Sequence, residues 1–201
     1  MRNLIFNYFN VNRKNFIILF ILFFVGFILG ILLINYTNDI QKEEITEYIN
    51  TLRESIQNNK VDNTYLLLLS IKRNCKLILL LWLLGCTIIG GILVYFVIIY
   101  KGFLLGYTAS SLIAVLGIRN GTIFAISSLF IQNLILIPAI FLIAESGIKL
   151  YKKIYTRCIN LRQEVIRHTV IMFITIMLSI VSSFAEIYFS VNILMFFKEI
   201  I

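Results

Sequence analysis

The stretch Lys101-Gly-Phe-Leu-Leu-Gly-Tyr-Thr-Ala-Ser-Ser111 places Gly102 and Gly106 one helical turn apart in an otherwise apolar segment. Further small residues continue the same face: Ser110, Ala114 and Gly117. Because no hydrophobic force drives helices together in a bilayer, small residues that allow close backbone approach must supply the contact. The stretch therefore predicts helices that pack against one another inside a membrane.

The composition of the whole chain agrees with this prediction. Of the 201 residues, 60% are hydrophobic and 14% are charged, and the mean hydropathy is +0.93, whereas about a quarter of the residues in a soluble domain are charged. The net charge of +8 comes mostly from basic residues beside apolar runs, which is typical of membrane anchoring and not of nucleic-acid binding. We expect a single integral membrane domain over residues 1–201, in contact with the lipid bilayer and with no nucleic acid.

The apolar runs set the expected number of membrane spans. A helix needs about 20 residues to cross the hydrocarbon core. Five runs reach or approach that length: 16–34, 77–100, 102–118, 122–147 and 170–197. Lys101 alone separates the second run from the third, which predicts a tight antiparallel hairpin, and the Asn120-Gly121 pair is a turn signal before the fourth. We expect an all-α polytopic membrane protein with a bundle of five transmembrane helices.

The basic residues predict the orientation of this bundle, because cytoplasmic loops retain positive charge. With the N-terminus in the cytoplasm, ten basic residues lie on the cytoplasmic side and eight on the other. The cytoplasmic linker 148–169 carries six basic residues against Glu164, whereas six acidic residues match the six basic ones of the extracytoplasmic loop 35–76. We expect a cytoplasmic N-terminus and an extracytoplasmic C-terminus.

The loop 35–76 has a pattern of its own. Ile45, Ile49 and Leu52 recur at helical spacing among charged residues, which indicates an amphipathic helix. A second helix is expected to start near Thr64 and to run through Arg73 into the membrane. This helical cap either covers the bundle or binds a partner, and the three apolar residues are the candidate contacts.

Two carboxylates and a proline stand inside apolar runs. An ionisable group at membrane depth is costly, so it is paired, protonated or turned toward the bundle interior. Glu145 precedes Lys149 by one turn, which favours a capping or snorkelling contact between the two side chains. No cation lies near Glu186 on its own helix, so an interhelical hydrogen bond and a partner contact are both open. Pro138 predicts a bend in the fourth helix.

The remaining reactive residue types form no catalytic or metal-binding motif, so we expect no enzyme, no cofactor and no metal site. The three cysteines share no C-x-x-C spacing. The single histidine, His168, lies near the end of the basic linker and is expected to face solvent or lipid headgroups. Gln132 and Asn133 are expected to face other helices, because amides in lipid seek partners.

Three stretches together resemble the stage II sporulation protein M family across essentially the whole chain: Ile71-Lys-Arg-Asn-Cys-Lys76, Tyr100-Lys-Gly-Phe-Leu-Leu-Gly-Tyr-Thr108, and the segment from Gln132 through Pro138 to Gly147. The resemblance carries over Asn74, Gly102, Gly106 and Pro138. It implies a five-helix layout and a membrane component of the engulfment machinery in endospore-forming bacteria.

The resemblance also implies a function. It is that of a non-enzymatic scaffold that recruits the peptidoglycan-degrading stage II sporulation proteins D and P to the septum and the engulfing membrane of the mother cell. An alternative from the residues alone is a small permease or channel subunit in which Glu145 and Glu186 line a polar path. Small residues on other helices, including Gly26 and Gly30, also permit a homo-oligomer.

Overall fold

The computed structural model describes residues 2–35, 47, 63–87, 89–126, 129, 131–156 and 160–197. The elements are α1 (Arg2–Asn35), α3 (Asn63–Gly85), α4 (Gly90–Leu116), α5 (Ile118–Ala125), α6 (Ile131–Tyr155) and α7 (Leu161–Phe197). The described part of the chain contains helices and no strand, which confirms the all-α prediction. The expected helix from near Thr64 is α3, which begins at Asn63.

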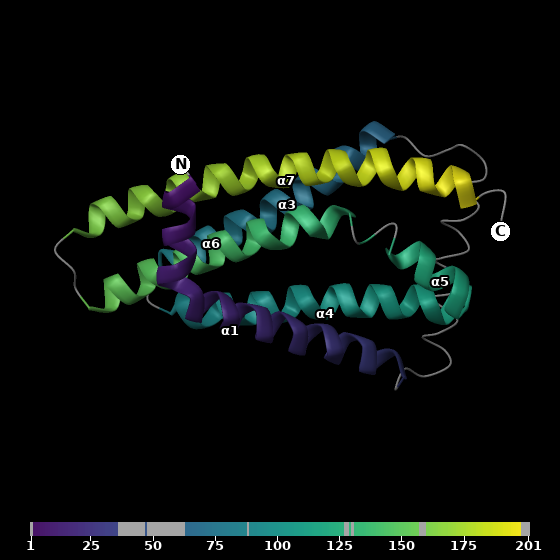
Figure 1. Ribbon diagram of the computed structural model, residues 1–201, viewed down its shortest axis with the longest axis horizontal. Coiled ribbons are helices and arrows are strands. Elements are labelled where there is room, and N and C mark those ends of the chain that lie inside the picture. The colour runs from purple at the N-terminus through teal and green to yellow at the C-terminus, as the bar shows by residue number, and fades with distance from the viewer. Residues whose placement is uncertain are drawn as a thin grey trace.

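The long helices lie side by side along one axis (Figure 1). α1 packs against α4, α3 packs against α7, and α6 contacts all four of these helices. α6 is accordingly the central helix, since 61% of its apolar span is buried, against 22 to 28% for the spans of α1, α4 and α7. The mostly exposed faces of these outer helices are apolar, as lipid contact requires.

Within the described part of the chain, four helices are long and apolar enough to cross a membrane, which corrects the prediction of five. Their spans are Lys14–Ile34, Gly90–Leu116, Gln132–Tyr155 and Leu161–Tyr188. α3 runs the length of the bundle beside them (Figure 1), but its middle turns carry Lys72, Arg73 and Lys76. Every stretch of α3 long enough to cross the core includes these three cations.

The predicted hairpin at Lys101 is wrong. α4 continues through Lys101, and the chain reverses near residues 86–89, between α3 and α4. There the Thr87 hydroxyl donates to the Leu84 carbonyl at 2.9 Å and the Gly90 amide donates to the Thr87 carbonyl at 3.2 Å. The turn carries no charge and therefore does not interrupt the apolar run, whereas a single lysine inside α4 does.

The predicted turn at Asn120-Gly121 is also wrong. Gly117 ends α4 with a φ of 80°, a left-handed conformation that glycine adopts without strain. Asn120 and Gly121 lie within α5, which folds back on α4 so closely that a Cβ on Gly121 would lie 2.5 Å from the Cα of Ile113. The predicted fourth run, 122–147, is therefore the end of α5 followed by α6.

The basic linker is shorter than predicted. Most of the expected linker 148–169 is helical, because α6 continues to Tyr155 and α7 begins at Leu161. Lys152 and Arg162 thus belong to helix ends. Lys152 donates to the Asn15 side chain at 3.3 Å, so the beginning of the α1 span and the end of α6 share one end of the bundle.

Glycines hold α1 and α4 together, as the opening stretch predicts. A Cβ on Gly102 would lie 2.1 Å from the Phe23 carbonyl oxygen, and one on Gly106 would lie 2.1 Å from that of Phe27. The contact is reciprocal, because Cβ atoms on Gly26 and Gly30 would lie 2.1 and 2.2 Å from carbonyl oxygens of α4. These four residues, which we call the glycine seam, therefore form an intramolecular interface.

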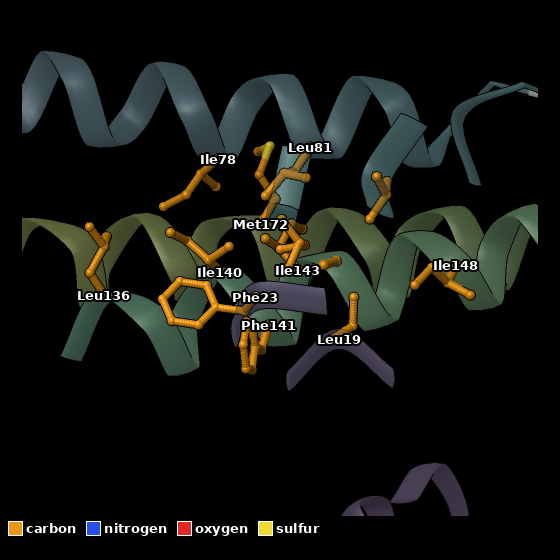
Figure 2. Close-up of a cluster of buried hydrophobic side chains, with 13 residues drawn as sticks. Leu19, Phe23, Ile78, Leu81, Leu136, Ile140, Phe141, Ile143, Ile148 and Met172 are labelled. Atoms are coloured by element: carbon orange, nitrogen blue, oxygen red, sulfur yellow. The ribbon is translucent and has the colours of Figure 1, made fainter. Parts of the chain in front are cut away.

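The apolar core surrounds α6 (Figure 2). It draws buried side chains from α1, α3, α4, α6 and α7, among them Leu19, Phe23, Ile78, Leu81, Leu136, Ile140, Phe141, Ile143 and Met172. The rings of Phe23 and Phe141 meet edge to face with centroids 5.8 Å apart, a favoured aromatic geometry. This core and the glycine seam fix the position of the polar side chains between α3, α6 and α7.

Candidate functional site

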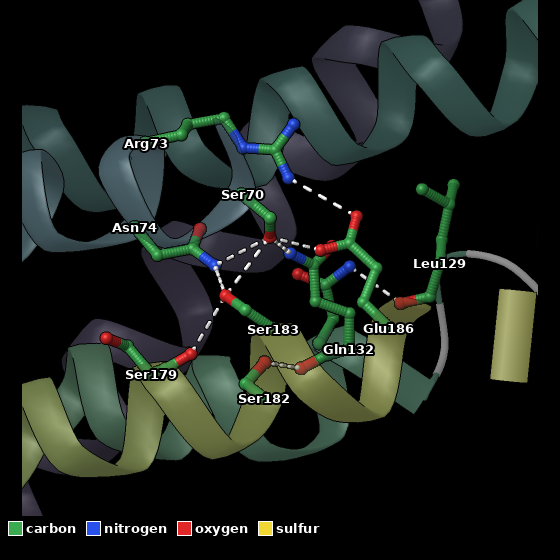
Figure 3. Close-up of polar contacts among 10 residues, drawn as sticks. Ser70, Arg73, Asn74, Leu129, Gln132, Ser179, Ser182, Ser183 and Glu186 are labelled. Carbon is green, nitrogen blue, oxygen red and sulfur yellow. Dashed lines mark hydrogen bonds and ion pairs between the residues drawn. The ribbon is translucent and has the colours of Figure 1, made fainter. Parts of the chain in front are cut away.

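Polar side chains, most of them buried, gather where α3, α6 and α7 meet (Figure 3). We call this set the polar cluster: Ser70, Arg73 and Asn74 of α3, Gln132 of α6, and Ser182, Ser183 and Glu186 of α7. The residues of α3 and of α7 recur at a helical spacing of three or four residues, and α6 contributes Gln132. The cluster joins positions more than 100 residues apart in the chain, such as Ser70 and Ser183.

Two side chains of α3 contact the carboxylate of Glu186. The Ser70 hydroxyl donates to one of its carboxylate oxygens, and the Arg73 guanidinium lies 3.4 Å from the other. Its side chain is 21% exposed, whereas that of Arg73 is 60% exposed. Of the two alternatives open for Glu186, the structure shows the interhelical hydrogen bond, together with an ion pair that the sequence does not predict.

Asn74 lies at the buried side of the polar cluster and is 1% exposed. Its amide nitrogen donates to the hydroxyl oxygens of Ser183 at 3.1 Å and Ser70 at 3.4 Å. Its carbonyl oxygen Oδ1 has no hydrogen-bond partner among the described residues. Asn74 therefore connects α3 to α7 and retains one unused acceptor.

Gln132 and Asn133 are buried, as predicted for amides in lipid. The Gln132 side chain donates to Ser70 at 3.4 Å, and its backbone carbonyl accepts from Ser182 at 2.8 Å. Asn133 instead donates to the Leu129 carbonyl at 2.7 Å. Gln132 thus connects α6 to both α3 and α7, while Asn133 stabilises the beginning of its own helix.

Lys101 adds a further charge near the polar cluster. It lies in the middle of α4 and is close enough to Arg73 and Glu186 to interact electrostatically with both. Two cations therefore surround the single carboxylate of the cluster. Such a set of charges inside an apolar bundle is costly unless it is paired, which the Arg73–Glu186 contact achieves in part.

His168 forms a second interhelical contact and corrects the expectation that it faces solvent or headgroups. It is 1% exposed. Its Nδ1 lies 2.9 Å from the Ser146 hydroxyl, and its Nε2 lies 3.2 Å from the Trp82 carbonyl oxygen. The imidazole thus joins α7 to α6 and α3, beside a close approach in which a Cβ on Gly85 would lie 2.7 Å from the Cα of Gly147.

Glu145 forms the predicted pair with Lys149. Its side chain is fully buried, and the Lys149 ammonium lies 2.9 Å from its carboxylate. Ser146, the next residue, contacts His168, and Glu186 is eighteen residues farther along α7 than His168, or about 27 Å. Glu145 and Glu186 therefore belong to separate contacts and do not share a site.

The other predicted residues occupy varied positions. Ser110 is half-buried on α4, beyond the glycine seam, and Pro138 is exposed on the outer side of α6, which continues through it. The candidate partner contacts Ile45, Ile49 and Leu52 lie outside the described residues. Among the described residues, no group of three or more histidine, cysteine or acidic side chains is placed to hold a metal ion.

Sequence reasoning missed the serines of the polar cluster. A signal for α7 is present in the sequence, because Thr175, Ser179, Ser182, Ser183 and Glu186 follow one another at helical spacing and mark one polar face. α3 has no serine or threonine at helical spacing from Ser70. Its role depends on contacts with α6 and α7, which the spacing within α3 does not predict.

The comparison with protein families matches residues 19–191 to stage II sporulation protein M. The chain belongs to the stage II sporulation protein M family. The matched range includes the glycine seam, the polar cluster and the contacts of His168, so it covers the whole bundle described above. The family membership identifies the chain as a sporulation-related membrane protein. No curated protein and no solved structure matches the sequence.

Proposed function

We propose that the chain is a non-enzymatic membrane scaffold of the engulfment machinery. In this role it recruits peptidoglycan-degrading partners, stage II sporulation proteins D and P, to the septum and the engulfing membrane of the mother cell. The family membership supports a sporulation role. The contacts of the polar cluster support a structural one, because its side chains are engaged in joining α3, α6 and α7.

The contacts at the other end of the bundle support the same proposal. Glu145 pairs with Lys149, and His168 bonds to Ser146 and the Trp82 carbonyl. The His168 contacts join three helices, and the Lys149 pair neutralises the buried carboxylate of Glu145 within α6. A rigid bundle of this kind suits a protein that positions others, while the partners perform the cutting of peptidoglycan.

We propose that the N-terminus is cytoplasmic and the C-terminus extracytoplasmic. The end of the bundle formed by the beginning of α1, the end of α6 and the beginning of α7 carries eight basic residues: Arg2, Arg13, Lys14, Lys149, Lys152, Lys153, Arg162 and Arg167. Among the described residues, Arg119 lies at the opposite end, and Lys72, Arg73 and Lys76 lie on the part of α3 nearest that end. Positive charge near the ends of spans favours the cytoplasmic side.

Copurification tests the scaffold. Tagged protein from sporulating cells is expected to recover proteins D and P, and replacing Ile45, Ile49 and Leu52 together with serine is expected to reduce that recovery several-fold. The matched control replaces three polar neighbours, Thr46, Asn50 and Gln57, with serine. Failure of the unaltered protein to recover either partner would exclude the scaffold, whereas full recovery by the apolar-to-serine variant would exclude only this contact segment.

A further inference from the structure

The outward face of α3 carries two lysines in an apolar surrounding. Lys72 and Lys76 are one turn apart and exposed. The side chains around them on the same face are large and exposed: Tyr65, Leu68 and Leu69 before them, and Leu79, Leu80 and Leu83 after them. A face of this composition is suited to contact with both hydrocarbon chains and a negatively charged group.

The charge of this face is not balanced within the described part of the chain. No carboxylate described by the structure pairs with Lys72 or Lys76. The neighbouring Arg73 pairs with Glu186 at 3.4 Å, and Lys101 of α4 lies close to both. Glu186 thus already faces two cations, and Lys72 and Lys76 add two more on the exposed side of α3.

The depth of the two lysines follows from the register of α3 and α6. Ser70 contacts Gln132 at 3.4 Å, and Gln132 is the first residue of the α6 span. Gly85 approaches Gly147, so the two helices run parallel, and Lys72 and Lys76 lie about 3 and 9 Å deeper than Ser70. A lysine side chain extends its ammonium toward the membrane surface from such depths.

We propose that this face of α3 binds an anionic phospholipid. The ammonium groups of Lys72 and Lys76 hold the headgroup phosphate, and the acyl chains lie along Leu79, Leu80 and Leu83. A phosphate supplies the missing negative charge at the depth that the lysines reach. A second copy of the chain is a poorer occupant, because Glu145, Glu164 and Glu186 are each paired within the bundle.

Trp82 provides a direct probe. It is the only tryptophan of the chain, it lies on α3 with its indole nitrogen 3.3 Å from the Thr169 hydroxyl, and it is about 9 Å along the helix from Lys76. Acyl chains that carry bromine quench tryptophan fluorescence on contact. In vesicles of phosphatidylcholine, dibrominated phosphatidylglycerol is therefore expected to quench Trp82 at a lower mole fraction than dibrominated phosphatidylcholine does, by about fivefold for each cation involved.

Two double variants test which lysines are responsible. Lys72→Gln with Lys76→Gln is expected to abolish the preference for phosphatidylglycerol, and Lys72→Arg with Lys76→Arg is expected to keep it. The control, Lys14→Gln with Arg162→Gln, removes two exposed charges from the opposite end of the bundle and is expected to leave the preference unchanged. In the unaltered protein the preference is also expected to weaken as salt is raised.

Three results would overturn the proposal. The first is equal quenching of the unaltered protein by the two lipids. The second is an unchanged preference in the glutamine variant. The third is weak quenching by both lipids, which would mean that a protein segment covers this face of α3.

Discussion

Asn74 is the residue whose position in the polar cluster matters most for stability. It is almost completely buried, it donates to hydroxyls on two helices, and its own oxygen has no partner in the described structure. Hydrogen bonds between membrane helices average about 0.6 kcal/mol and reach about 1.7 kcal/mol. One of the two contacts of Asn74, with Ser183, joins two helices, so its contribution falls within that range.

Replacing Asn74 with alanine is therefore expected to lower the free energy of unfolding by about 1 kcal/mol, measured by circular dichroism in mixed micelles. Thr108→Ala is the control, because the Thr108 hydroxyl donates only to the Leu104 carbonyl of its own helix, at 2.8 Å. Equal losses for the two variants would show that the contact between α3 and α7 contributes nothing to stability.

A contact of a single residue can be predicted from the sequence when both partners lie on the same helix. Glu145 and Lys149 are one turn apart on a single helix, so their spacing predicts the pair. His168 and Asn74 contact residues on other helices, and no local pattern predicts which hydroxyl or carbonyl each one meets. The basic residues beside His168 in the sequence therefore predict an exposed position, although the residue is buried.

The contact of α1 with α4 shows how elements pair in this bundle. The glycine seam brings the two backbones so close that a Cβ on any of its four glycines would lie 2.1 or 2.2 Å from a carbonyl oxygen. A side chain at any of these positions would collide with backbone atoms, so the two helices would have to move apart. The α1–α4 contact therefore depends on the absence of side chains at these positions.

Replacing Gly106 with leucine is accordingly expected to destabilise the protein by at least about 1 to 3 kcal/mol, seen as unfolding at a lower SDS fraction. Ala114→Leu adds a comparable side chain at an exposed position of the same helix and is expected to change the unfolding midpoint little. A Gly106→Leu variant as stable as the Ala114→Leu variant would exclude close packing of α1 on α4.

The glycine seam and the element boundaries differ in how far the sequence predicts them. Glycines at positions 102 and 106 indicate close packing whatever the helix boundaries are. The predicted boundaries near Lys101 are wrong, because a single charge inside an apolar run resembles a loop although the helix continues through it. The real reversal near Thr87 contains only small or apolar residues and is held by hydrogen bonds, which hydropathy does not detect.

The distribution of charge is a property of the whole molecule and predicts its orientation. The end of the bundle at which Lys152 contacts Asn15 is basic, which supports the proposal that this end is cytoplasmic. Lys72, Arg73 and Lys76, which the sequence analysis places in the extracytoplasmic loop, lie within α3 instead, and Lys101 lies within α4.

Labelling with a membrane-impermeant maleimide tests the orientation. In a variant whose three cysteines are replaced with serine, Arg119→Cys is expected to be labelled in intact cells, and Arg162→Cys only after the membrane is opened. Both positions are exposed at opposite ends of the bundle, so each serves as the control for the other. The reverse pattern would invert the assigned topology.

The glycine seam also limits how neighbouring proteins meet this bundle. Gly26, Gly30, Gly102 and Gly106 are occupied within a single chain, so an arriving transmembrane segment encounters bulky rings and branched chains such as Phe20, Phe24, Phe173 and Phe184. Binding of such a segment to this surface must depend on complementary side-chain shapes and on the entropy gained when lipid is released. Complexes of this kind are sensitive to the choice of detergent, and their isolation calls for extraction with native membrane around them.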